Sequence, residues 1–230
     1  MALYALADLH LSSMLDKKMD KFGENWINHG AKIEENWLNT VADDDTVIIG
    51  GDVSWAMRLN EAEADLKFID SLPGKKIIHS GNHDYWWDSA SKLNGMFESI
   101  FFMKNDFCSY GEYAICGSRG WLCPNGSHFS AHDEKIYKRE IIRCHLSFDK
   151  AIRAGYEKFI FTLHFPPTND KKEQSEFTEI AEKYKVKQVV YGHLHGEKSF
   201  GASLSGEFGG TIYSLVSADY LNFTPKLLME

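Results

Sequence analysis

The stretch from Ile77 to Trp87 reads IIHSGNHDYWW, and it carries the decisive signal for the fold. It begins as a hydrophobic strand and ends in two tryptophans, but an amide, an imidazole and a carboxylate follow one another in its middle. In α/β sheets the carboxyl ends of the strands line the ligand crevice. The stretch therefore predicts a buried strand that runs into a functional loop.

Other short apolar runs alternate with amphipathic ones. Ala2 to Ala7 and Thr46 to Ile49 read as buried strands, because they are apolar or β-branched and are bounded by turn residues. Apolar residues recur at helical spacing between them, and a second helical pattern stops at Pro73-Gly74. This alternation indicates an α/β layered fold. Later, a helix is predicted over Asp133 to Ala154, and strands are predicted at SIFFM, EYAICGS, FIFTL, QVVYG and TIYSLVS. Strands without helices between them indicate a mixed sheet or two packed sheets.

Five of the predicted strands end in metal-binding residue types, which together use five of the ten histidines. Because such ends share an edge of a sheet, their side chains could converge on one point. Glycines beside several of them suit tight turns and close backbone approach. Each motif alone also fits an ordinary surface turn or a hydrogen-bonded polar residue. The five ends are Asp8-Leu9-His10, Gly50-Gly51-Asp52, Gly81-Asn82-His83-Asp84, His164 and Gly192-His193-Leu194-His195.

In this order, DLH, GGD, GNHD, an isolated His before two prolines, and GHLH resemble the motifs of the calcineurin-like metallophosphoesterases. The motifs span Asp8 to His195, which is most of the chain. The resemblance implies an α/β fold in the form of a four-layer α/β/β/α sandwich, with two mixed β-sheets flanked by helices. It also implies a single domain over residues 1–230 and a binuclear metal centre.

The resemblance assigns the metal ligands residue by residue. One ion would take Asp8, His10, Asp52 and His195, and the other would take Asp52, Asn82, His164 and His193, so that Asp52 bridges the two ions. Mixed nitrogen and oxygen donors without thiolates suit divalent transition metals better than Ca²⁺. Mn²⁺ is the expected ion, and Fe, Zn²⁺, Co²⁺ and Ni²⁺ fit the same donors.

The implied activity is that of a metal-dependent phosphoric ester hydrolase, in which a metal-bridging hydroxide attacks phosphorus. The family places the counterpart of His83 near the leaving group, so we expect His83 to act as general acid, with a structural His as the alternative. Asp84 is a second candidate catalytic residue, although fixing the loop through backbone hydrogen bonds suits it better. Relatives such as the protein phosphatases carry an acid three residues after the bridging Asp, where this chain has Trp55.

The substrate is less clearly encoded. Gly117 to Lys135, GSRGWLCPNGSHFSAHDEK, is a polar stretch long enough to reach over the site. Arg119, His128 and His132 are candidate contacts for an anionic substrate, although an ordinary exposed loop would carry the same residues. Trp86, Trp87 and Trp121 could stack a base, but core packing is the stronger expectation.

Composition narrows the function classes. With 230 residues, 43% of them hydrophobic, the chain is long enough for one sizeable core. A net charge of −8 without a Lys/Arg block makes generic nucleic-acid binding unexpected and favours a small phosphomonoester or phosphodiester. The sequence shows no apolar run of about 18 residues and no basic signal-peptide start, so no membrane partner is expected. The four cysteines lack CxxC spacing, which indicates free thiols in a cytoplasmic protein.

Two rival readings remain. The all-helical HD-type phosphohydrolases use a His-Asp pair, present here at His83-Asp84 and His132-Asp133, but the first pair follows a β-rich run. A catalytically weak, protein-binding scaffold with the same fold is the non-enzymatic alternative. The chain retains every expected ligand and His83, which favours the enzyme. Monoesterase, diesterase and nuclease activities stay open, as does the oligomeric state.

Overall fold

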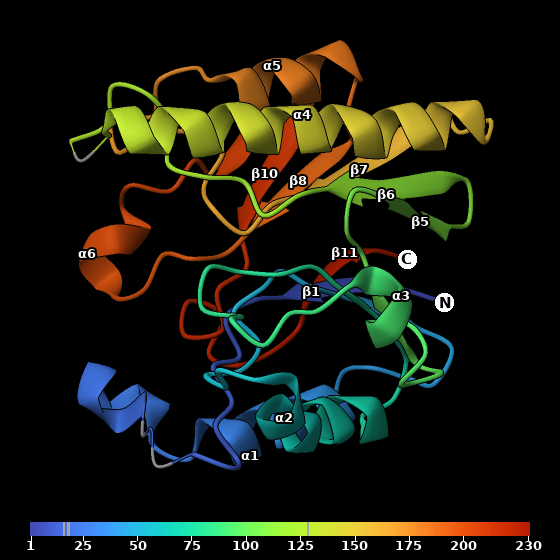
Figure 1. Ribbon diagram of the computed structural model, residues 1–230, viewed down its shortest axis with the longest axis vertical. Coiled ribbons are helices and arrows are strands. Elements are labelled where there is room, and N and C mark those ends of the chain that lie inside the picture. The colour runs from blue at the N-terminus through green and yellow to red at the C-terminus, as the bar shows by residue number, and fades with distance from the viewer. Residues whose placement is uncertain (16, 18, 128) are drawn as a thin grey trace. The chain divides into compact units, whose positions relative to one another are not determined.

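The computed structural model describes residues 1–15, 17, 19–127 and 129–230. The chain divides into two units, the first made of Met1–Phe102 with Val216–Glu230 and the second of Met103–Leu215. Each unit is built on one mixed β-sheet with helices against it (Figure 1). The predicted α/β fold with two mixed sheets and flanking helices is confirmed. A single domain over residues 1–230 stays a prediction.

The first unit holds a five-stranded sheet in the order β11-β1-β2-β3-β4. The strands β1 to β4 run parallel, and β11 pairs with β1 in the antiparallel sense. Helices α1 and α2 lie on the same face of this sheet (Figure 1) and bury Trp37 and Leu66. The strands are β1 (Leu3–Leu6), β2 (Thr46–Ile49), β3 (Lys75–Ile78), β4 (Ile100–Phe102) and β11 (Lys226–Met229), and the helices are η1 (Met19–Phe22), η2 (Glu24–Trp26), α1 (His29–Leu38), α2 (Leu59–Ser71) and α3 (Ala90–Leu93).

The second unit holds a six-stranded sheet in the order β5-β6-β7-β8-β10-β9. Its four central strands are parallel, and β5 and β9 pair antiparallel at the edges. Helices α4 and α5 cover the same face (Figure 1). The strands are β5 (Phe107–Tyr110), β6 (Tyr113–Gly117), β7 (Lys158–Thr162), β8 (Gln188–Tyr191), β9 (Gly206–Phe208) and β10 (Thr211–Leu215), and the helices are α4 (Ala131–Arg153), α5 (Glu176–Lys183) and α6 (Glu197–Phe200).

Helix α4 illustrates how the sequence produces these elements. Ser130 caps its N-terminus, where the hydroxyl accepts a hydrogen bond from the Asp133 N–H. Apolar residues three or four positions apart then form one buried face, which includes Tyr137, Cys144 and Phe148. The helix therefore starts two residues before the predicted Asp133 because the cap lies outside the apolar pattern.

The structure also bears on the expectations for cysteines, tryptophans, the all-helical alternative and membrane-spanning helices. All four cysteines are free thiols, as predicted, and Cys116 is buried in β6. Trp86 is buried in the core of the first unit, as expected, whereas Trp87 and Trp121 are partly buried. Strands β1 to β11 exclude the all-helical HD-type scaffold. Within the described residues, every helix is too short or too polar to cross a bilayer.

Candidate metal centre and active site

Two of the predicted ligand motifs lie on neighbouring parallel strands of the first unit. β1 ends just before Asp8, and β2 ends just before Asp52. Hydrogen bonds between the two loops extend the sheet ladder past the strands, because Asp8 N donates to Gly51 O and His10 N donates to Asp52 O, each at 2.9 Å. The two loops are therefore held in fixed register, and both motifs lie at the same edge of the sheet.

The backbone at four predicted ligands adopts the left-handed region. The φ angles are 60° at Asp8, 46° at His10, 50° at Asp52 and, in the second unit, 72° at His193. This conformation is uncommon for residues other than glycine, and local strain of about 1–3 kcal/mol per residue is typical of functional sites. The strained backbone therefore coincides with the predicted ligands, a signal that the sequence did not reveal.

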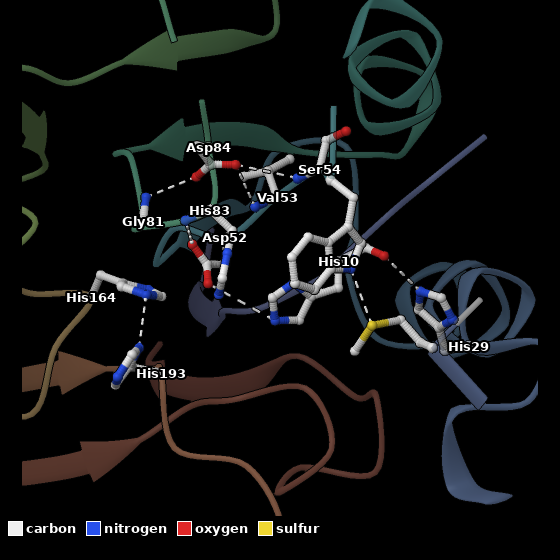
Figure 2. Close-up of polar contacts among 12 residues, drawn as sticks. His10, His29, Asp52, Val53, Ser54, Gly81, His83, Asp84, His164 and His193 are labelled. Atoms are coloured by element: carbon white, nitrogen blue, oxygen red, sulfur yellow. Dashed lines mark hydrogen bonds and ion pairs between the residues drawn. The ribbon is translucent and has the colours of Figure 1, made fainter. Parts of the chain in front are cut away.

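The Asp52 carboxylate is buried among these loops. Its Oδ1 accepts a hydrogen bond from the His83 backbone N–H at 2.8 Å, and its Oδ2 lies 3.9 Å from His10 Nε2 (Figure 2). A Cβ on Gly81 would lie 2.0 Å from Asp52 Oδ1, which no side chain could tolerate. The glycine of GNHD is thus required because the Asp52 carboxylate lies against its backbone.

Asp84 ties the GNHD loop to the loop that follows β2. Its Oδ1 accepts hydrogen bonds from Val53 N (2.9 Å) and Ser54 N (3.3 Å), and its Oδ2 accepts one from Gly81 N at 2.8 Å (Figure 2). Trp86 Nε1 also donates to Oδ1, at 3.0 Å. Burial and the nearby charge of Asp52 raise the pKa of Asp84, and the backbone donors oppose that rise. These contacts agree with a loop-fixing role, and direct participation of Asp84 in catalysis stays a prediction.

Trp55 lies against the His83 imidazole, with ring centroids 4.5 Å apart and planes tilted by 47°. His83 and Asn82 are both partly buried, so both are accessible from solvent. Many relatives carry an acid at this position of the sequence. Here the position is Trp55, whose ring contacts His83.

The second unit contributes three predicted ligands at the ends of neighbouring parallel strands. His164 follows β7 and is buried, and its backbone N–H donates to Arg119 O at 2.9 Å. His193 and His195 follow β8 and are partly buried. His193 Nδ1 lies 3.3 Å from His164 Nε2 (Figure 2).

That separation tests whether the two imidazoles fit one ion. Two nitrogens on a tetrahedral ion with bonds of 2.0–2.1 Å lie about 3.3 Å apart. The observed distance between His164 Nε2 and His193 Nδ1 matches this value. The donor chemistry fits equally well, because imidazoles here and carboxylates at Asp8 and Asp52 are common transition-metal ligands. Each predicted ligand set draws on both units, and their joining into one centre stays a prediction.

The structure describes two of the three predicted substrate contacts. The Arg119 guanidinium stacks over Trp121, with Cζ 4.6 Å from the ring centroid, and its Nη2 lies 3.8 Å from Oε1 of the buried Glu140. His132 is exposed in the first turn of α4, and His128 lies outside the described residues. Arg119 is therefore held by Glu140 and Trp121, and contact of any of the three with substrate stays a prediction.

Asp65 is a residue of the site region that sequence reasoning missed. It is buried on α2, where its Oδ1 accepts a hydrogen bond from Ser13 N at 2.9 Å and its Oδ2 accepts one from the Ser54 hydroxyl. Asp65 thereby links the loop after β1 to the loop after β2. The available signal was a carboxylate on the buried face of an amphipathic helix, beside Leu66.

Comparison with known proteins assigns the family. The sequence model for calcineurin-like phosphoesterases matches residues 1–197 of this chain. The chain belongs to the calcineurin-like phosphoesterase family. The resemblance inferred from the five motifs is thus confirmed, and membership indicates a phosphoesterase-type hydrolase.

The individual proteins to which this chain is similar share little of its sequence. The Gene 66 protein of Mycobacterium phage L5 is 24% identical over 192 residues, which cover 82% of this chain and 75% of that protein. Phosphopantetheinyl Hydrolase (PptH) from Mycobacterium tuberculosis has a TM-score of 0.52 at 17% identity, covering 99% of this chain and 95% of its own. The protein TT1561 of Thermus thermophilus has a TM-score of 0.56 at 13% identity, covering 99% and 97%. The two structures share the fold with this chain.

Proposed function

We propose that this calcineurin-like phosphoesterase is a binuclear metal-dependent hydrolase of small phosphoesters. One observation carries the proposal. All seven predicted ligand side chains, together with His83, lie at or just beyond strand ends inside the segment that matches the family. A scaffold that had lost catalysis would not need to keep this complete set.

Both units would supply ligands to each ion. Asp8, His10 and Asp52 of the first unit would join His195 of the second at one ion, and Asp52 and Asn82 would join His164 and His193 at the other. When bound, two divalent ions polarise a phosphoryl oxygen and lower the pKa of a water molecule. The nitrogen and oxygen donors suit Mn²⁺, Fe, Zn²⁺, Co²⁺ and Ni²⁺. Of these, Mn²⁺ is the expected ion and the one to test first.

The other residues of the site would hold the GNHD loop in position and protonate the leaving group. His83 would donate a proton to the oxygen of the leaving alcohol, and the aromatic contact with Trp55 would orient its ring. Asp84 would hold the GNHD loop through its hydrogen bonds to Gly81, Val53 and Ser54. None of these tasks requires a charged partner for His83.

Charge supports a small substrate in preference to a nucleic acid. The chain carries a net charge of −8 and lacks the basic blocks that neutralise a row of phosphates. A small phosphomonoester or phosphodiester therefore fits better than a polymer. The four free cysteines support a reducing compartment, for which the cytoplasm is the expected place.

The test is an activity screen of the Mn²⁺-loaded protein across phosphomonoesters, cyclic nucleotides, dinucleotides and single-stranded DNA. The proposal predicts hydrolysis of at least one small phosphoester, its loss on chelation, and its recovery when Mn²⁺ is restored. Asp8→Asn should abolish the activity, whereas the exposed control Asp43→Asn should retain it. A fully loaded protein that hydrolyses no member of the panel would contradict the proposal.

A further inference from the structure

A pocket of about 270 Å³ lies in the second unit beside His193. His193 and Leu194, which follow β8, line it together with the loop after β6 and residues that follow β7. The volume is slightly below the roughly 300 Å³ at which pockets begin to enclose a whole small ligand. The pocket therefore has room for one group of a ligand whose remainder lies outside, next to the predicted metal ligand His193.

The pocket wall is mainly apolar. Leu122 and Phe129 come from the loop after β6, Pro166 follows β7, and Leu194 and Ala202 follow β8. Leu122 is 37% exposed, so part of this apolar wall faces solvent. An apolar group that enters the pocket gains by removing this surface from water.

Most polar residues of the wall already have hydrogen-bond partners in the protein. Ser127 Oγ donates to Asp170 Oδ2 at 2.6 Å. Asn169 Nδ2 donates to Pro124 O and Glu173 Oε2, and its Oδ1 accepts hydrogen bonds from two backbone N–H groups. Thr168 differs, because its buried Oγ1 has no hydrogen-bond partner within the described part of the chain. The wall therefore offers apolar contact and few polar groups that need a ligand.

The charge of the pocket disfavours an anion. Asp170 is the carboxylate of the wall, and the hydrogen bond from Ser127 lowers its pKa, which keeps it ionised at neutral pH. Lysine and arginine do not occur among the described lining residues. A second phosphate or a carboxylate in this pocket would meet the like charge of Asp170, and no lysine or arginine among the described lining residues would compensate it.

We propose that this pocket binds the uncharged, mainly apolar organic group of the phosphoester whose phosphoryl group lies at His193. The inference rests on the proposed function, because it takes His193 to be a metal ligand. It narrows the substrate class to phosphoesters with an apolar alcohol, as opposed to nucleotides or sugar phosphates.

Phosphonates that cannot be hydrolysed test the pocket by binding alone. The Mn²⁺-loaded full chain is titrated with methyl-, propyl- and hexylphosphonate by calorimetry, and with 5-carboxypentylphosphonate as a charged ligand of hexyl length. Burial of one methylene contributes about 0.8 kcal/mol, so affinity should rise about fourfold per carbon until the pocket is filled. The carboxylate-tailed ligand should bind at least about tenfold more weakly than hexylphosphonate.

Two variants place the effect in the pocket. Ala202→Phe fills the space and should flatten the dependence on chain length, and Leu122→Asp, a change at a partly exposed position, should lower hexylphosphonate affinity in the same way. Ala154→Phe at the exposed end of α4 is the matched control and should retain the gradient.

The outcomes separate the pocket from the proposed function. Affinity that is independent of chain length, absence of phosphonate binding, or a full gradient in both pocket variants would overturn the inference. Graded binding without hydrolysis of any phosphoester would leave the pocket standing and contradict the proposed function. Hydrolysis of a phosphoester together with phosphonate affinity that does not depend on chain length would support the proposed function and contradict the role of the pocket.

Discussion

The indole of Trp55 stacks on the imidazole of His10, with ring centroids 4.8 Å apart and planes at 19°. His10 also meets the edge of Trp26, with ring centroids 5.9 Å apart. Trp55 therefore contacts both a predicted metal ligand and, at 4.5 Å, the predicted general acid His83. Trp55 thus packs against two of the predicted site histidines, at the position where the resemblance led us to expect an acid.

Removing the Trp55 ring should weaken metal binding at one of the two predicted positions. An aromatic pair contributes about 0.5–1.5 kcal/mol beyond the area that it buries, so Trp55→Ala should weaken Mn²⁺ binding at the His10 position by about 2- to 13-fold. Trp55→Phe keeps a flat ring against His10 and should remain within about twofold of the parent. Mn²⁺ titration followed by calorimetry measures both variants, and parent-like affinity in Trp55→Ala would show that the stack does not position His10.

A methyl group at Gly81 should displace the Asp52 carboxylate from its position. Because the added Cβ would lie 2.0 Å from Asp52 Oδ1 and 2.3 Å from Asp52 N, the loop or the carboxylate has to move. We expect Gly81→Ala to lose most metal binding, as judged by elemental analysis after dialysis. Gly95→Ala is the matched control, since its Cβ would meet only ordinary contacts from 3.5 Å outward. Full metal content in Gly81→Ala would argue against the geometry of this loop.

Lys76 should make stability depend on pH in the alkaline range. It is buried, and its Nζ donates to the carbonyl oxygens of Leu72 (2.7 Å), Gly74 (2.9 Å) and Asp70 (3.2 Å) at the end of α2. Burial lowers the pKa of Lys76 from 10.5 to about 8. Between these values the unfolded chain binds more protons than the folded one, so the free energy of unfolding contributed by Lys76 rises with pH.

The comparison for this prediction is between Lys76→Met and the parent. Over pH 8 to 10.5 the parent should gain up to about 3 kcal/mol relative to the variant, measured by urea unfolding. Every other ionisable group is common to both proteins, so the difference isolates Lys76. Lys75→Met, at an exposed neighbouring position, should track the parent. A parent–variant difference that does not change with pH would refute the assignment.

The role proposed for His83 predicts a dependence on the leaving group. A general acid contributes about 10²- to 10⁴-fold, and more for a basic alkoxide than for nitrophenolate, which leaves without a proton. His83→Asn should therefore keep its metals, lose much of its kcat on an alkyl phosphoester, and lose distinctly less on a nitrophenyl ester. Loss of metal, or equal losses on both esters with chemistry rate-limiting, would make His83 a structural residue.

The sequence was most informative where a hydrophobic run stops at a ligand. Asp8, Asp52 and His164 could be placed because the end of a short apolar strand is visible in the sequence, and parallel strands share an edge. Strands β5 and β9 were missed for the opposite reason. FCSY does not alternate clearly, and all three residues of β9 are exposed, so neither carries a core-facing pattern.

Other features depend on tertiary context. The left-handed backbone at His10 cannot be read from a residue type that usually adopts other conformations. Asp65 looks like any acidic residue of an amphipathic helix until its hydrogen bonds to Ser13 and Ser54 are seen. The pocket beside His193 combines residues more than 70 positions apart, from Leu122 to Ala202, so composition and periodicity give no sign of it.

A carboxylate that bridges two metal ions is needed for both of them, so the number of ions bound per chain shows whether Asp52 has this role. The parent, Asp52→Asn and the exposed control Asp43→Asn are loaded with Mn²⁺, desalted and measured by elemental analysis against protein concentration. We expect two ions per chain in the parent and in Asp43→Asn, and one or fewer in Asp52→Asn, because a bridging carboxylate would serve both positions. Two ions retained by Asp52→Asn would contradict the bridge, and a parent that binds one ion or none would contradict the binuclear centre itself.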